Sequence, residues 1–275
     1  MQLSLLKALY TDKLTKLYRL SEAENIFYIV LYYLERKSKT AVLLGQETMI
    51  GDTYVELLSN LIEGKPVQYV LGDAPFYGLD LYVDENVLIP RPETEELVHW
   101  ILEDNPAFSG SVIDIGTGSG CIPLALKKHW PQARLSGCDI STEALAVAQR
   151  NGKEQKLEVT FFYKDILKEE IDTYDIIISN PPYIAKSEKD KMHKNVLDYE
   201  PLLALFVDDT DPLLFYKRIL QLASKKKTTC YFETSEFYRN DLDTWLTQNE
   251  YNFEWKLDFQ EKNRMLKVMF STVIK

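Results

Sequence analysis

The stretch "SVIDIGTGSG", residues 111–120, joins a short apolar run to a glycine-rich turn. Gly116, Gly118 and Gly120 stand at alternate positions in that turn. Glycine permits tight turns and close backbone approach, and a helix that follows adds unpaired N–H groups. The spacing is not the dinucleotide fingerprint, because Cys121 stands where its third glycine belongs. The stretch therefore predicts a strand, a ligand-binding turn and a helix; a glycine turn without a ligand is the alternative.

Strand and helix patterns alternate on both sides of this turn. Strands are expected at residues 111–115, 134–139, 159–164, 174–179, 228–233, 252–259 and 265–274, and helices near residues 95–102, 123–129, 143–149 and 212–222. Such alternation is typical of an α/β fold in which helices cover both faces of a mostly parallel sheet. We therefore predict an α/β domain with a seven-stranded sheet.

The first part of the chain has a different pattern. Leu3, Leu6, Tyr10 and Leu14 recur at helical steps, and residues 21–24, "SEAE", have the spacing of a capping box. Residues 75–90 alternate and contain Gly78, which favours a hairpin. The predicted organisation is a helical bundle over residues 1–72, a β-hairpin linker over 73–90 and the α/β domain over 91–275.

Composition limits the cellular setting. The longest apolar run, residues 26–34, is shorter than the roughly 20 residues that a membrane helix needs. Lys7 and Asp12 interrupt the N-terminus too early for a secretory leader, so the prediction is a cytoplasmic protein without a membrane partner. The 3 cysteines and 3 histidines are scattered, which predicts neither a disulfide framework nor a metal site.

Charge is distributed unevenly along the chain. Residues 1–72 hold 8 basic and 8 acidic side chains, so residues 73–275 carry the whole net charge of −10. An acidic surface repels phosphate backbones. The charge therefore counts against a nucleic-acid partner.

Acidic residues close the second and third strands of the expected sheet. Asp139 ends one strand, and Asp165, followed by Ile166, ends the next. Ligands of such sheets bind beyond the carboxyl ends of the strands, where an acid can accept both hydroxyls of a ribose. Asp165 could accept from an adenine amine while Ile166 packs on the ring. Taken singly, each of the two acids could instead be a surface carboxylate or a helix cap. Together with the glycine turn, these residues predict an adenosine-shaped pocket.

The fourth strand ends in "NPPY", Asn180, Pro181, Pro182 and Tyr183. Two prolines stiffen the turn and remove two backbone donors. A simple strand stop is the alternative interpretation. In combination with the pocket, the quartet resembles the signature of class I S-adenosylmethionine-dependent methyltransferases that modify planar amide or amine nitrogens, including adenine-N6 DNA and guanine-N2 ribosomal RNA enzymes.

Longer segments resemble one family within that class, the release factor glutamine-N5 methyltransferases (HemK/PrmC family). The resemblance lies in residues 64–98 with "IPRPETE" at 89–95, in "YEPLLAL" at 199–205 and in "DFQEKNRML" at 258–266. Two departures are "TDPLLFY" at 210–216 and Pro123, which a first helical turn tolerates. The resemblance covers nearly the whole chain from Gly64 and implies a Rossmann-like class I methyltransferase.

The resemblance also implies partners and roles. The cofactor S-adenosyl-L-methionine would contact Gly116, Thr117, Gly118, Ser119, Gly120, Asp139, Asp165, Ile166 and Asn180. Asn180, Pro181, Pro182 and Tyr183 would hold the Gln amide of the Gly-Gly-Gln loop of class 1 peptide chain release factors. A monomer is expected, with the helical bundle binding the protein substrate.

Other interpretations remain open at this point. A methyltransferase acting on a nucleobase amine or on a ribosomal-protein glutamine would share the pocket, and a non-catalytic translation-associated module would share the fold. Arg91 could line the cleft or merely begin a helix. Glu200 could order residues 185–198, which form either a lid or a solvated loop in which His193 is ordinary surface.

Overall fold

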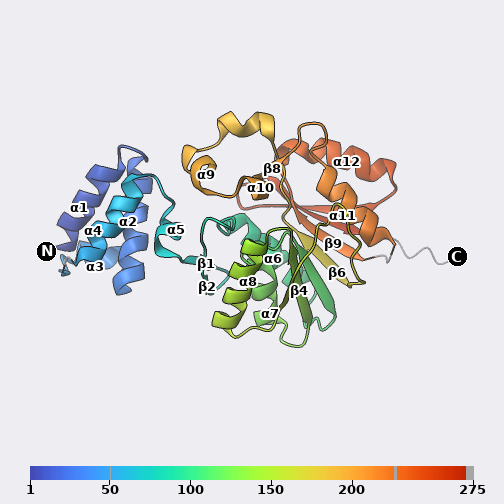
Figure 1. Cartoon of the computed structure of the whole chain (residues 1–275), viewed down its shortest axis with the longest axis horizontal. Helices are drawn as coiled ribbons and strands as arrows, with labels where there is room; N and C mark the ends of the chain where they lie inside the picture. Colours follow the sequence, from blue (N-terminus) through green and yellow to red (C-terminus); the bar gives the residue numbers. More distant parts are fainter. Residues whose placement is uncertain (50, 226–227, 271–275) are drawn as a thin grey trace. The chain divides into compact units, whose positions relative to one another are not determined.

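The computed structural model describes residues 1–49, 51–225 and 228–270 (Figure 1). The chain forms two compact units: Met1–Asp73 together with His193–Tyr199, and Ala74–Met192 together with the residues from Glu200 on. No helix in the described part of the chain is long and apolar enough to cross a membrane.

The first unit is helical. It consists of α1 (Leu3–Leu14), α2 (Leu20–Glu35), α3 (Lys39–Leu43), α4 (Asp52–Ile62), α5 (Val67–Leu71) and α9 (Lys194–Tyr199). The periodic residues Leu3, Leu6, Tyr10 and Leu14 are buried in its core, as their spacing predicts. The predicted capping box is wrong: α2 starts at Leu20, so Ser21 lies inside the helix and no side chain caps its first turn.

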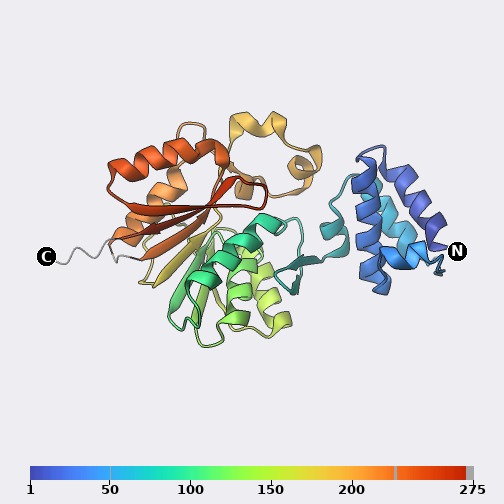
Figure 2. The same ribbon diagram turned by 180° about the vertical axis from the view of Figure 1, so that it is seen from behind.

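The second unit contains the predicted seven-stranded sheet (Figure 2). The strand order is β10 (Asn252–Leu257), β11 (Asn263–Met269), β9 (Thr229–Glu233), β6 (Ile176–Ser179), β3 (Ser111–Ile115), β4 (Arg134–Asp139) and β5 (Thr160–Tyr163). The five strands from β9 to β5 are parallel, while β11 runs antiparallel to both of its neighbours, β9 and β10. The last predicted strand ends at Met269, and its predicted continuation over residues 271–274 lies outside the described residues.

Helices cover both faces of this sheet, as predicted (Figure 1). One face packs against α6 (Pro92–Asp104), α7 (Cys121–His129) and α8 (Thr142–Gln155), with Trp100 and Leu124 in its core. The other face packs against α11 (Leu214–Ser224) and α12 (Arg239–Gln248), with Tyr216 and Leu246 in its core. The carboxyl ends of the five parallel strands therefore meet at one edge between two layers of helices.

Short elements complete the second unit. The hairpin joins β1 (Ala74–Phe76) to β2 (Leu79–Leu81) through Tyr77 and Gly78, both at positive φ. The hairpin is shorter than predicted, because β2 ends at Leu81 and a turn follows. In this turn the backbone N–H of Asn86 donates to the carboxylate of Asp84. The remaining elements are β7 (Ile184–Ala185), paired in parallel with β8 (Phe206–Val207), α10 (Leu202–Leu205), and the 3₁₀ turns η1 (Lys186–Lys191) and η2 (Glu236–Tyr238).

Candidate active site

A cavity of about 340 Å³ opens at the carboxyl ends of the parallel strands. Its lining includes many of the residues that the sequence predicts for the site: Gly116, Gly118, Asp139, Asp165, Ile166, Asn180, Pro181 and Pro182. The predicted residues Thr117, Ser119, Gly120 and Tyr183 lie near it without lining it. The sheet topology thus brings residues from four strand ends to one cavity.

The glycine turn forms one wall. Gly116 and Gly118 have φ values of 73° and 52°, and a Cβ added to either would meet no atom within 4 Å. Open space therefore lies directly against this backbone. Gly120 has a different role, because a Cβ there would stand 2.9 Å from the Phe161 ring. Its lack of a side chain lets α7 pack closely against the sheet.

Buried polar groups next to the glycine turn lack partners. The carboxylate of Asp114 is 1% exposed, and neither oxygen has a hydrogen-bond partner among the described residues. The hydroxyls of Thr117 and Ser119 are likewise buried and unpartnered. Burial raises the pKa of Asp114 to about 7. These three side chains lie next to the cavity without lining it. Because an unpaired buried polar group costs free energy, either a water molecule or a polar or cationic ligand group has to supply the missing partners.

Asp139 is held in place by backbone amides. The N–H of Gly118 donates to its Oδ2 at 2.9 Å, and the N–H of Ser141 donates to Oδ1 at 3.0 Å. Burial raises the pKa of Asp139, although both amide hydrogen bonds favour the ionised form. A carboxylate oxygen can accept more than one hydrogen bond, so both oxygens retain capacity for a ligand.

Asp165 lines the cavity and also caps a turn. Its Oδ1 accepts from the N–H of Leu167 at 3.1 Å, and Lys168 approaches Oδ2 at 2.8 Å and lowers the pKa of the carboxyl. Asp165 is buried, which counts against the surface interpretation, while a capping role and a ligand-binding role are compatible. Ile140 and Phe215 add apolar lining that the sequence analysis missed. Ile140 directly follows Asp139 at the end of a strand, and this position could have predicted its place in the lining.

The Asn-Pro-Pro-Tyr turn follows β6, which pairs with β3, and forms a further wall of the cavity. Asn180 lines the cavity, and its Nδ2 donates to Oγ1 of Thr94 at 3.3 Å. Tyr183 instead directs its hydroxyl to Oε1 of Glu233 at 3.3 Å, and burial raises the pKa of that phenol. The turn is thus anchored through side chains that belong to α6 and β9.

Glu233 and Thr94 are polar residues that the sequence analysis missed. They are 2% and 3% exposed, and Thr94 Oγ1 lies 2.6 Å from Glu233 Oε2. Burial raises the pKa of Glu233, while hydrogen bonds from Thr94 and Tyr183 oppose that shift. Glu233 ends β9 as Asp139 ends β4, so the same strand-end pattern could have identified it.

Arg91 begins α6 and does not line the cavity. Its Nη2 donates to both carboxylate oxygens of Glu200, at 2.7 and 2.8 Å, and the Glu200 side chain is 2% exposed. Glu200 directly precedes the segment 201–204, from which Pro201, Leu203 and Ala204 line the cavity. The ion pair therefore fixes one wall of the cavity against the start of α6.

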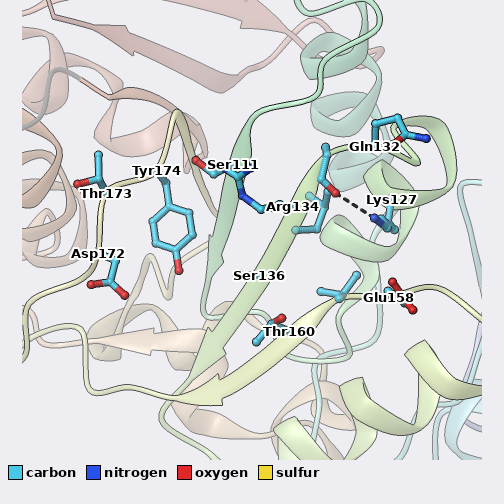
Figure 3. Close-up of a pocket in the computed structure, with 13 residues that line it drawn as sticks. Ser111, Lys127, Gln132, Arg134, Ser136, Glu158, Thr160, Asp172, Thr173 and Tyr174 are labelled. Atoms are coloured by element: carbon cyan, nitrogen blue, oxygen red, sulfur yellow. Dashed lines mark hydrogen bonds between the residues drawn. The ribbon is translucent and has the colours of Figure 1, made fainter.

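A second hollow, of about 720 Å³, lies at the amino ends of β3, β4 and β5 (Figure 3). Its lining includes Arg134, Glu158 and Asp172, which are exposed, and Lys127, whose Nζ donates to the backbone oxygens of Pro131 and Ala133. None of the predicted site residues lines this hollow. In the described part of the chain, no cluster of three or more His, Cys, Asp or Glu side chains could hold a metal ion.

Comparison with known proteins agrees with this geometry. Residues 94–198 match the family model "Methyltransferase small domain". The chain is 40% identical to a release factor glutamine methyltransferase from Flavobacterium psychrophilum, over 95% of this chain and 96% of that protein. A protein of the same name from Bacteroides thetaiotaomicron is 42% identical, over 76% of this chain and 79% of the relative. The hMettl16 catalytic domain, solved in complex with MAT2A 3′UTR hairpin 6, has a similar fold, with a TM-score of 0.57 and 16% identity over 85% of this chain and 87% of that one.

A glycine turn, strand-end carboxylates and an Asn-Pro-Pro-Tyr turn on a Rossmann-like sheet define a class I methyltransferase. The match to the Flavobacterium protein, which extends over nearly the whole of both chains, also identifies the family within this class. The chain belongs to the release factor glutamine methyltransferase family. S-adenosylmethionine is accordingly its methyl donor. The open space at Gly116 and Gly118 and the unpaired carboxylate of Asp114 fit a ligand with polar and cationic groups.

Proposed function

We propose that this protein transfers a methyl group from S-adenosylmethionine to the side-chain amide nitrogen of the Gln in the Gly-Gly-Gln loop of class 1 peptide chain release factors. The names of its relatives support this substrate. The structural observation that carries the proposal is that Asn180 and Pro181 line the same cavity as Gly116 and Asp139. The residues proposed to bind the amide and those proposed to bind the nucleoside thus line one cavity.

Specific residues would hold the cofactor. Asp139 would accept from the ribose hydroxyls, Asp165 from the adenine amine, and Ile166 would pack on the ring. The unpaired carboxylate of Asp114 would pair with the ammonium of the methionine part, which supplies the partner that this buried group lacks. When bound, the cofactor supplies an electrophilic methyl group on a sulfonium.

The Asn-Pro-Pro-Tyr turn would hold the substrate amide. An amide nitrogen is a weak nucleophile because its lone pair is delocalised into the carbonyl. Oδ1 of Asn180 and the backbone oxygen of Pro181 would accept its two N–H bonds, which orients the nitrogen and raises its electron density. Pro182 stiffens the turn, and Tyr183, which does not line the cavity, anchors the turn through its hydroxyl on Glu233. The proton can leave after methyl transfer, when the nitrogen has become acidic.

The helical unit, residues 1–72, would bind the release factor outside its Gln loop. It is charge-balanced and has several strongly exposed apolar side chains, including Leu5, Leu43, Leu44, Met49 and Val55. In this proposal the enzyme acts as a monomer in the cytoplasm, the 73–90 segment links the two functional parts, and no nucleic acid binds directly. A much higher kcat/KM on intact factor than on a short Gly-Gly-Gln peptide would support binding by the helical unit.

The direct test uses labelled cofactor and a purified class 1 release factor. Mass spectrometry should locate the label on the Gln of the Gly-Gly-Gln loop, and a factor with Gln→Ala at that position should remain unlabelled. Label on ribosomal protein or on nucleic acid in a mixed extract, with the purified factor unlabelled, would favour the other methyltransferase substrates instead.

A further inference from the structure

A chain of hydrogen bonds leads from Asn180 to a buried carboxylate. Nδ2 of Asn180 donates to Oγ1 of Thr94 at 3.3 Å, and Thr94 donates to Oε2 of Glu233 at 2.6 Å. The second oxygen of Glu233 accepts from the hydroxyl of Tyr183 at 3.3 Å. Thr94 and Glu233 are buried, whereas Asn180 also lines the cavity. One end of the Asn180 amide therefore faces the protein and the other is available to the cavity.

The chemistry of these groups gives the chain a direction. Each oxygen of Glu233 accepts a hydrogen bond, one from Thr94 and the other from Tyr183, and a threonine hydroxyl has a single hydrogen to donate. Since Thr94 donates that hydrogen to Glu233, its oxygen can only accept from Asn180. The NH₂ end of the Asn180 amide must then face Thr94, which leaves Oδ1 on the side of the cavity.

We propose that Glu233 and Thr94 are positioning residues that fix the orientation of the Asn180 amide, so that its oxygen rather than its NH₂ group meets the substrate. This proposal rests on the proposed function, because the substrate amide donates hydrogen bonds and needs an acceptor. If the Asn180 amide were reversed, its NH₂ group would face the N–H groups of the substrate amide, and neither side could accept a hydrogen bond. Glu233 and Thr94 thus act through Asn180 without touching the substrate.

Glu233→Gln is the sharpest variant. Glutamine has nearly the same shape, but its NH₂ group can donate to Thr94, whose hydrogen is then free to bind Oδ1 of Asn180. The Asn180 amide should reverse, and kcat should fall by about 10–100-fold because the substrate amide is misplaced. Thr94→Val, which removes the hydroxyl, should have a similar effect. Thr94→Ser, which keeps the hydroxyl, should restore kcat close to the parent value.

A matched control separates positioning from stability. Tyr231 lies on β9 two residues before Glu233, is 1% exposed, and donates to Asp104 away from the cavity at 2.9 Å. Tyr231→Phe also removes a buried polar contact, so it should lower Tm without lowering kcat. Cofactor Kd should stay at the parent value in all four variants, because the ribose and adenine residues lie on other strand ends.

A readout other than activity tests the amide itself. The Asn180 side-chain ¹⁵N–¹H signals, identified by their loss in Asn180→Ala, should exchange slowly with solvent in the parent and in Thr94→Ser. They should shift and exchange faster in Thr94→Val and Glu233→Gln. These signals report amide orientation even if the parent enzyme does not methylate release factor, so the two proposals can fail separately.

The proposal is overturned if Glu233→Gln and Thr94→Val keep both the parent kcat and the parent Asn180 signals. It is also overturned if Tyr231→Phe loses as much kcat at an equal loss of Tm, or if Thr94→Ser fails like Thr94→Val. If Glu233→Gln does not fold, the kcat values and Asn180 signals of Thr94→Ser and Thr94→Val are sufficient to test the proposal.

Discussion

The two edges of the central sheet each carry a hollow, and the proposed site occupies the smaller of the two. At the amino edge the hollow measures about 720 Å³, and at the carboxyl edge the cavity measures about 340 Å³. Arg134 and Glu158 line the hollow at the amino edge (Figure 3). Both residues are exposed to water. At the carboxyl edge, Asp114 is buried without a partner, and Asp139 is held by two backbone amides.

We infer from this difference that the burial and pairing of polar groups identify a binding site better than the volume of the hollow does. Water satisfies polar groups on an open surface at little cost, whereas a buried polar group without a partner costs free energy until a ligand supplies one. Substitutions at the carboxyl edge should therefore impair binding or catalysis, and substitutions at the amino edge should leave both intact.

The largest effect is expected at Asn180. Asn180→Ala should lower kcat by about 10²–10³-fold, because it removes a preorganised polar group from the transition state. Single-turnover methylation measures this loss, and cofactor Kd should change much less. Near-normal turnover by a well-folded Asn180→Ala would mean that the Asn-Pro-Pro-Tyr turn merely ends a strand.

A smaller effect is expected on cofactor binding at Asp139. If its oxygens accept from the ribose hydroxyls, Asp139→Ala should weaken binding by about 1.5–3 kcal/mol, or roughly 10–150-fold. Isothermal titration with S-adenosylmethionine gives the two dissociation constants. Equal values for parent and variant would remove Asp139 from the site.

Asp114 should make cofactor affinity depend on pH. Because burial raises its pKa to about 7, the carboxyl is mostly protonated at pH 6 and must lose its proton to pair with an ammonium group. Affinity should therefore fall by about tenfold from pH 8 to pH 6. Asp114→Asn cannot ionise and should lose this part of the pH dependence. Identical pH profiles for the parent and Asp114→Asn would contradict the assignment.

The smallest effect is expected at the amino edge. The side chain of Arg134 is exposed. Its backbone N–H donates to the backbone oxygen of Gly110, and a change of side chain keeps this bond. Arg134→Ala should change stability by less than about 0.5 kcal/mol. Its cofactor Kd and kcat should equal those of the parent. A clear loss of either would show that the amino-edge hollow takes part in function.

Local patterns were enough to predict most of the fold. The apolar strands and the glycine turn are continuous in sequence, and parallel strands place their carboxyl ends at one edge, so Asp139 and Asp165 could be assigned to a shared cavity. Helix α12 was missed, because most of its residues are polar and only Leu242 and Leu246 are fully buried.

Contacts between distant segments could not be predicted. Thr94 and Glu233 are 139 positions apart, and their hydrogen bond depends on how α6 packs on the sheet. His193 is exposed, as expected, but its ring also lies parallel to that of Tyr18 in the helical unit, with the two ring centroids 6.4 Å apart. Asn195 donates to the Tyr18 hydroxyl at 2.6 Å. Periodicity reports which face of an element is buried and does not report its partner.

Hydrogen exchange with and without S-adenosylmethionine tests most directly whether the carboxyl edge is the site. The account predicts that the cofactor slows amide exchange in peptides covering residues 114–120, 139–144, 165–167 and 180–183. Peptides covering residues 132–136 and 158–160, at the amino edge, should exchange as fast as in the free protein. Protection at the amino edge with none at the carboxyl edge would contradict the account.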